Sequence, residues 1–178
     1  MRSCWSIWWN VLTRLNDLWI RFAAHTQILE AYAQLLDFDT YGSINVEGLY
    51  TPGRQSRPQC DMSCMISREM FREFVVPCLN YEADDVDAMH YHLDGPGAIH
   101  HLKALCEIEG LDVISWVPGT GEGQTQDWTA LYKKIDDLGK GQTRGASHED
   151  IDVYGGNTNH ESCSFTRQPY QSRKQKTF

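Results

Sequence analysis

The sequence predicts an α/β fold with parallel strands, and the run from residue 89 to residue 121 carries most of this prediction. There a short apolar strand is followed by a Gly-Pro-Gly loop, a stretch of helical periodicity, a second apolar strand and a Pro-Gly turn. This succession is typical of a βαβ unit, whose two strands are parallel. The chain of 178 residues is long enough to bury a core, and its 41% apolar and 22% charged residues are ordinary for a globular domain.

Apolar residues recur at three- and four-residue steps through the first 36 residues, a pattern that indicates amphipathic helices. The pattern runs from Trp5 to Phe22 and resumes from Ile28 to Leu36. We therefore expect two helices, or one kinked helix, in this part of the chain.

Residues 40–66 change character, because glycine and proline interrupt short apolar stretches there. Residues 43–49 and 60–66 are each short enough, and sufficiently bounded by turn residues, to be strands. The sequence predicts a strand, a long loop and a second strand over this region.

A helix is expected after residue 66. Ser67 suits its N-cap, because the hydroxyl accepts a hydrogen bond from a first-turn amide, and Glu69 would lie near the positive end of the helix dipole. The apolar stripe of this helix consists of Met70, Phe71, Phe74 and Val75. Pro77 has no amide hydrogen and is expected to end or kink the helix.

The next unit is a strand over residues 88–93 and a helix that begins at Pro96, since proline is favoured at the first helical position. The buried face of this helix is expected to carry Ile99, Leu102, Leu105 and Cys106. Its outer face is expected to carry His100, His101 and Lys103. A buried strand over residues 111–117 follows.

A last helix is indicated by Asp127 as its cap, by apolar residues at helical spacing, and by Gly139 as its stop signal. From Gly141 onward no period persists and polar residues dominate, with a basic cluster near the end. We therefore expect one folded domain over residues 1–140 and an irregular or disordered tail over residues 141–178.

Charge and cysteine content exclude several functional classes. The formal net charge of −8 argues against a nucleic-acid-binding surface, which needs clustered cations to release phosphate counterions. No uninterrupted run of 18 apolar residues is present, so no membrane-spanning helix is expected. The six cysteines form no Cys-x-x-Cys pair, which predicts no disulfide framework and suits a reducing cytoplasm.

Three segments together resemble the uroporphyrinogen decarboxylase superfamily, in particular its uncharacterised branch near the corrinoid-dependent methyltransferases. They are QCDMSCMISREMFREFVVP, YHLDGPGAIHHLKAL and LDVISWVPGTGEG. The similarity runs from about residue 15 to residue 140. The family implies a (β/α)8 barrel with its active site at the carboxyl ends of the strands. Because a full barrel needs typically ~250 residues, the resemblance implies an α/β chain of partial (β/α)8, TIM-barrel-like type with an irregular C-terminal tail.

The carboxyl end of the strand over residues 88–93 holds the strongest candidate site. His92 and Asp94 alternate along the strand and therefore face the same side, where both are candidate catalytic residues. The resemblance places them where methyltransferase relatives carry a zinc-binding His-x-Cys pair, which makes His92 a candidate zinc ligand. The alternative is that His92 bonds a loop carbonyl and Asp94 caps the next helix. His90, on the same side, is either a substrate-binding residue or a core histidine.

Four residues elsewhere are further candidates. The resemblance implies a pocket position for Asp61, as a catalytic residue, and for Ser63, as a substrate-binding residue. The neighbouring Cys60 and Cys64 are either buried structural cysteines or metal ligands. Glu47 is a candidate substrate-binding carboxylate, unless it is an ordinary solvated loop residue. Trp116 is a candidate apolar wall for a planar ligand, or it only seals the barrel top.

Three functions are consistent with these residues and the resemblance. The first is methyl transfer between a methylated small molecule or corrinoid and a thiol or corrinoid acceptor, with zinc and corrinoid as cofactors and a corrinoid protein as partner. The second is decarboxylation of a porphyrinogen side chain, which needs no metal but does need cations to hold the substrate's acetates. The third is a truncated binding or assembly chain, whose open sheet edges would favour association with a second copy.

Overall fold

A four-stranded parallel sheet forms the centre of the computed structural model, which describes residues 24–143. The strands follow one another in chain order, β3-β4-β5-β6. Their bounds are β3 Gln55–Ser56, β4 Ala88–Asp94, β5 Val113–Val117 and β6 Gly141–Thr143. The α/β class with a parallel sheet is therefore confirmed.

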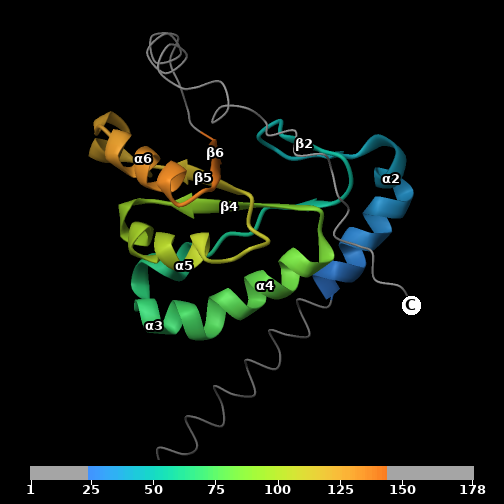
Figure 1. Cartoon of the computed structure of the whole chain (residues 1–178), viewed down its shortest axis with the longest axis horizontal. Coiled ribbons are helices and arrows are strands. Elements are labelled where there is room, and N and C mark those ends of the chain that lie inside the picture. The colour runs from blue at the N-terminus through green and yellow to red at the C-terminus, as the bar shows by residue number, and fades with distance from the viewer. Residues whose placement is uncertain (1–23, 144–178) are drawn as a thin grey trace, which may run out of the picture.

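Helical segments make each connection between neighbouring strands. They are η1 Asp61–Met65, α3 Arg68–Met70, the π-helical turn η2 Phe71–Val75 and α4 Val76–Asp85 before β4, then η3 Pro96–His101 and α5 Leu102–Cys106 before β5, and η4 Gly121–Thr125 and α6 Thr129–Asp137 before β6. Parallel strands joined in sequence by right-handed crossovers place their helices on one face of the sheet. Figure 1 shows α3, α4 and α5 together on one side of β4.

The hydrophobic core lies between the sheet and these helices. Met89, Tyr91 and Leu93 of β4 alternate into it, as do Ile114 and Trp116 of β5. The helices contribute a matching set of buried side chains: Phe71, Leu79, Leu102, Leu105, Leu131 and Ile135. Each strand of the pair β4–β5 therefore has one apolar face, and its other residues lie on the opposite face.

Side chains also close the end of the sheet at which the strands begin. The Met89 amide donates to the Asp112 carboxylate (2.9 Å), and the Arg54 amide donates to the Asp87 carboxylate (2.9 Å). Lys140 donates to the Ile108 carbonyl (2.8 Å) and to that of Leu111. These bonds satisfy backbone groups in the connections that lead into the strands, so this end of the sheet is occupied by structural contacts.

Residues 24–35 are helical, in agreement with the helix expected over residues 28–36, and α2 Phe38–Tyr41 follows. Arg54 joins this region to the sheet, because its guanidinium bonds Glu30 (3.1 Å) and Asp39 (3.1 Å). The helical pattern expected from Trp5 to Phe22 lies outside the described residues.

The segment 43–49 is not one strand, as the sequence predicted, but belongs to a hairpin of β1 Ser43–Ile44 and β2 Tyr50–Thr51. The Asn45 side-chain oxygen accepts from the amides of Glu47 (2.9 Å) and Leu49 (3.0 Å), and Gly48 has a φ of 81°. An asparagine that bonds its own loop, followed by a residue in the left-handed region, is turn chemistry that the apolar pattern hid.

The strand predicted over residues 60–66 is also wrong, because this segment forms the 3₁₀ helix η1. Met62 and Met65 are exposed, so the apolar residues do not line one buried strand face. The parallel strand at this edge is instead β3, whose Gln55 and Ser56 pair with Ala88 and Met89. With only two residues, β3 is too short to show a period in the sequence.

Ser67 caps its helix as expected, with its hydroxyl accepting from the Met70 amide at 3.2 Å. The helix does not end at Pro77 but continues through α4. The π-helical turn η2 ends at Val75, two residues before this proline. A widened turn accommodates the missing amide bond, and such turns are recognised causes of helix kinks. The expected end of the helix at Pro77 is therefore wrong.

The expected outward position of His101 is wrong, because His101 is 1% exposed and stacks on Phe71 at 4.1 Å between ring centroids. Its Nε2 bonds the Ser63 carbonyl at 2.8 Å, while the half-buried His100 bonds that of Ile66. Residues 96–101 form a 3₁₀ helix with three residues per turn, which turns Ala98 and His101 to the same side. A prediction based on 3.6 residues per turn placed His101 on the wrong face.

The last helix lies where expected, and Gly139 follows it with a φ of 76°. Its N-cap residue is Trp128 and not Asp127, whose carboxylate instead accepts from the Thr129 amide at 2.8 Å in the turn before the helix. However, Gly141–Thr143 does not belong to an irregular tail. It forms β6 and pairs in parallel with β5. A three-residue strand gains its order from the neighbouring strand, so its own residues carry no periodic signal. The remainder of the expected tail, residues 144–178, lies outside the described residues.

Candidate functional site

A row of polar side chains crosses the sheet on the face opposite the helices. His92 of β4 is in register with Ser115 of β5, and Ser115 is in register with Thr143 of β6. His90 lies two residues before His92 and therefore on the same face. This row and the loop side chains that bond it are called the polar face below.

The β1–β2 hairpin covers part of the polar face, and in Figure 1 it lies on the opposite side of β4 from α4 and α5. Asn45 of the hairpin donates from Nδ2 to Nδ1 of His90 at 2.8 Å. The Asn45 oxygen already accepts two loop amides, so its NH₂ group must face the imidazole. His90 therefore carries its proton on Nε2, and burial lowers the pKa of this 5% exposed histidine.

Glu47 is the centre of the hydrogen bonding on this face. Its carboxylate accepts from Arg57 through Nε (3.0 Å) and Nη2 (2.5 Å), from the Ser115 hydroxyl (2.6 Å) and from the Thr143 hydroxyl (3.2 Å). Burial acts to raise the pKa of Glu47, but the bonds from Ser115 and Arg57 outweigh it and hold this pKa below its ordinary value. Glu47 is therefore a charged hydrogen-bond acceptor at neutral pH and a weak base.

Arg57 links Glu47 to His92. Its Nη2 lies 2.8 Å from Nδ1 of His92 as well as bonding Glu47. A guanidinium group can only donate, so Nδ1 of His92 accepts this bond and its Nε2 is the ring nitrogen that carries a proton. Arg57 follows β3 directly, and the Pro58 carbonyl next to it accepts from the His92 amide at 3.0 Å. The guanidinium is thus fixed beside β4 by backbone pairing.

The structure does not enclose His92 and Asp94 in one pocket. Both lie on the same face of β4, but His92 is half-buried and bonded to Arg57, whereas Asp94 is exposed at the end of the strand. Asp94 also makes no cap bond to η3, whose N-cap residue is Gly95. The strand ends at Asp94, and the chain turns away over the glycine, so the Asp94 carboxylate faces solvent.

Asp61, Ser63 and Trp116 lie away from the polar face. Asp61 is exposed in η1, and Ser63 is buried there with its carbonyl bonded to His101. Trp116 alternates onto the helix face of β5, where it is 4% exposed and packs edge-on against Trp128 at 5.0 Å. Of the residues predicted for the site, the structure brings together His90, His92 and Glu47.

The zinc that the family resemblance implied for His92 does not fit these residues. Within residues 24–143, no group of three or more His, Cys, Asp or Glu side chains is arranged to hold a metal ion. A structural or catalytic zinc site needs at least three protein ligands. In addition, Nδ1 of His92 already accepts from the cationic Arg57, which would repel a second cation.

The residues that the sequence analysis missed are Asn45, Arg57, Ser115 and Thr143. Ser115 offered a signal, because it is a polar residue that interrupts an apolar strand between Ile114 and Trp116. Arg57 follows a strand too short to recognise, and Thr143 lies in the segment expected to be a tail. Their convergence on Glu47 joins residues up to 96 positions apart, which no local pattern shows.

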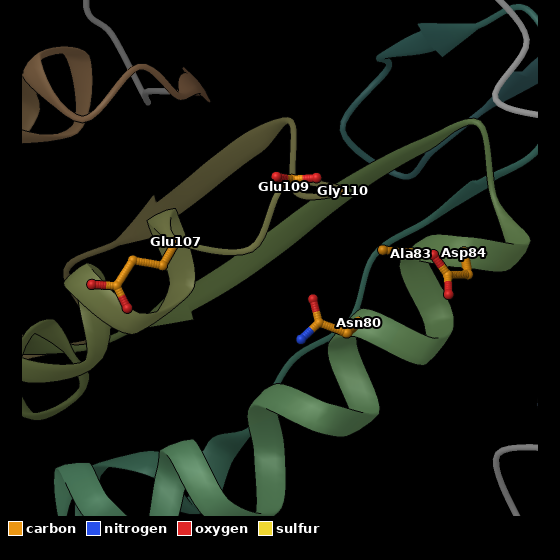
Figure 2. Close-up of a pocket in the computed structure, with 6 residues that line it drawn as sticks. All are labelled: Asn80, Ala83, Asp84, Glu107, Glu109 and Gly110. Carbon is orange, nitrogen blue, oxygen red and sulfur yellow. The ribbon is translucent and has the colours of Figure 1, made fainter.

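Two shallow cavities of about 420 Å³ each lie elsewhere. One is between α4 and the connection from α5 to β5, at the end where the strands begin, and Figure 2 shows its six lining residues. Asp84 and Glu107 extend there from different elements without pointing toward one another, and Glu107 is paired with Arg72 at 2.6 Å. The other lies beside the helix of residues 24–35. Neither cavity is lined by residues of the polar face.

Comparison of the chain with protein-family models, with curated proteins and with solved structures gave no match. Within residues 24–143, no helix has the length and apolar character that a membrane crossing requires.

Proposed function

We propose that the chain is a partial (β/α)8 barrel of the uroporphyrinogen decarboxylase superfamily type. Strand order supports this proposal, because the four parallel strands follow in chain order, as they do around such a barrel. A doubly wound sheet would instead reverse its order at a switch point. In a barrel the face away from the helices is the interior, and here that face carries His90, His92, Ser115 and Thr143.

We further propose that the polar face catalyses metal-free decarboxylation of a small carboxylate substrate, such as a porphyrinogen side chain. The observation that carries this proposal is the placement of the Arg57 guanidinium between a carboxylate and the imidazole of His92. A guanidinium holds a substrate carboxylate through paired hydrogen bonds. Imidazole is the side chain best suited to proton transfer near neutral pH.

The proposed reaction needs no electron acceptor. The bond between the substrate carbon and its carboxyl group breaks, CO₂ leaves, and the electron pair stays on the carbon. That carbon then takes one proton. In the proposal Arg57 turns from Nδ1 of His92 to the substrate carboxylate, the freed imidazole takes a proton from solvent, and His92 passes a proton to the carbon. Methyl transfer, the other reaction that the resemblance implies, has less support because no set of zinc ligands assembles on this face within residues 24–143.

The test is CO₂ release from uroporphyrinogen by the purified full chain. We expect release above the uncatalysed rate, a loss of about 10²-fold or more in His92→Gln through removal of the general acid, and a rise in KM in Arg57→Gln. Asp94→Asn is the matched control, because Asp94 lies on the same strand face but is exposed, and its activity should be unchanged. No release by the wild-type chain, or equal release by His92→Gln, contradicts the proposal.

A further inference from the structure

The donors that bind Glu47 belong to the sheet, whereas Glu47 belongs to a loop. Ser115 and Thr143 lie on β5 and β6, and Arg57 directly follows β3, so two strands and the residue after a third supply the four donor atoms. Glu47 comes from the loop between β1 and β2. The backbones of the three donor residues are therefore held by the sheet and its edge, independently of where the loop lies.

The donor set matches a carboxylate group rather than a particular residue. A guanidinium offers two parallel donors through Nε and Nη2, and both meet the same Glu47 oxygen, Oε1, which also accepts from Ser115. Thr143 donates to the second oxygen, Oε2. Both oxygens are thus bonded, and every group involved is a side chain that would bond a carboxylate on a free molecule equally well.

The loop that carries Glu47 is weakly attached. Its strands have two residues each, and Ile44, Val46 and Tyr50 are 69%, 89% and 55% exposed, so they contribute little apolar packing. Its other side-chain bonds to the sheet region include that of Asn45 to His90 and that of Gln55 to the Leu49 carbonyl (3.2 Å). Water can replace such bonds when the loop lifts, which makes this segment one of low local stability.

We propose that Glu47 is an internal occupant of a carboxylate subsite, and that a ligand carboxylate displaces it together with the loop of residues 45–49. This inference rests on the proposed function in placing the ligand on the polar face. It adds the ligand group that binds there and the segment that must move to admit it. In the closed state Glu47 neutralises Arg57, and in the open state the ligand carboxylate takes over that role.

The first experiment measures binding of sodium propionate to the full chain by calorimetry. Glu47→Ala removes the internal competitor while leaving Arg57, Ser115 and Thr143 in place, so we expect propionate to bind about 10- to 100-fold more tightly than to the wild type. The double variant Glu47→Ala/Arg57→Gln should lose this gain. The same measurements with propionamide should show no gain, because the amide carries no charge.

Glu30→Ala is the matched control. Glu30 is also paired with a sheet-edge arginine, Arg54, but it lies on a helix rather than on the polar face. If Glu30→Ala gains as much propionate affinity as Glu47→Ala, the effect belongs to any broken ion pair and the inference is wrong. An unchanged affinity in Glu47→Ala overturns it equally.

A second measurement uses the wild-type chain and does not depend on a variant that folds. Hydrogen exchange of the amides of Glu47 and Leu49, which donate to Asn45, should become faster when propionate is added. Unchanged or slower exchange at saturating propionate overturns the inference. The proposed function can fail separately from this inference. Tight binding of propionate to Glu47→Ala without CO₂ release by the wild type would support the carboxylate subsite and contradict the decarboxylase. CO₂ release by the wild type without a gain in propionate affinity in Glu47→Ala would support the decarboxylase and contradict the subsite.

Discussion

The two faces of the central sheet differ in what holds them. On the helix face, Tyr91, Leu93 and Ile114 are at most 1% exposed and pack among apolar helix residues. On the polar face, His92 and Ser115 are held by hydrogen bonds to side chains that arrive from a loop and from the end of β3. The strands therefore use one face for apolar packing and the other for a network of hydrogen bonds between polar side chains.

The helix face should respond most strongly to mutation. Ile114→Ala removes a fully buried side chain and leaves a cavity, so we expect a loss of about 2–5 kcal/mol in the free energy of unfolding. Val113→Ala, on the neighbouring residue and the opposite face, should cost much less, because Val113 is only half-buried. Denaturant unfolding of both variants measures the difference. Equal losses would show that the two faces do not differ in packing.

The polar face should respond through charge rather than packing. Arg57→Gln leaves the Glu47 carboxylate without its cation, and both side chains are only about a fifth exposed, at 21% and 22%. We expect a loss of about 1–3 kcal/mol in the free energy of unfolding. The matched variant is Arg72→Gln, which breaks a short ion pair between half-exposed side chains at 47% and 48%, and its effect should be much smaller. A larger loss in Arg72→Gln would contradict the assignment of the buried charge to the polar face.

Acid should weaken the helix face through His101, and this is the smallest of the three effects. Burial lowers the pKa of His101 below its ordinary value of 6.5. The unfolded chain therefore binds a proton more readily than the folded one, so the contribution to stability is complete above about pH 6.5 and is lost as the pH falls below it. Protonation would also place a charge beside His100, at 3.7 Å between ring centroids, and Arg68.

The measurement is the free energy of unfolding between pH 8 and pH 5 for the wild type and for His101→Gln. The variant should lose less stability on acidification than the wild type does, whatever its stability at pH 8. His90 also has a pKa lowered by burial. Because His90 and its partner Asn45 are the same in both proteins, the contribution of His90 to the pH dependence cancels in the comparison. Parallel curves for the two proteins would show that His101 does not couple stability to pH.

Part of the fold was predictable because it depends on local signals. The strand before Gly95, the helix start at Pro96 and the N-cap at Ser67 each follow from the preferences of a few neighbouring residues. The errors fall where elements are too short or too irregular for a period. β3 and β6 have two and three residues, and η1 and η3 are 3₁₀ helices that change the phase of the pattern, which placed His101 wrongly.

The candidate site, too, was predictable only in part. Alternation along β4 placed His90 and His92 on one face, because a strand's side-chain direction is fixed by its backbone. Neither alternation nor the resemblance identified Arg57 or Thr143, and the enclosure expected for Asp94 was wrong. Whether a residue at the end of a strand is enclosed depends on whether the following segment folds over it. After Asp94 the chain turns at Gly95 into η3 and does not cover the Asp94 side chain.

By itself, the sequence determined that strands and helices alternate, where the long elements lie, and which face of β4 carries the imidazoles, because these properties arise from neighbouring residues and backbone geometry. Only the tertiary structure decided that Glu47, Arg57, Ser115 and Thr143 meet at one carboxylate. Their meeting depends on strand order and register, which join segments far apart in the chain through backbone hydrogen bonds that every sequence can make.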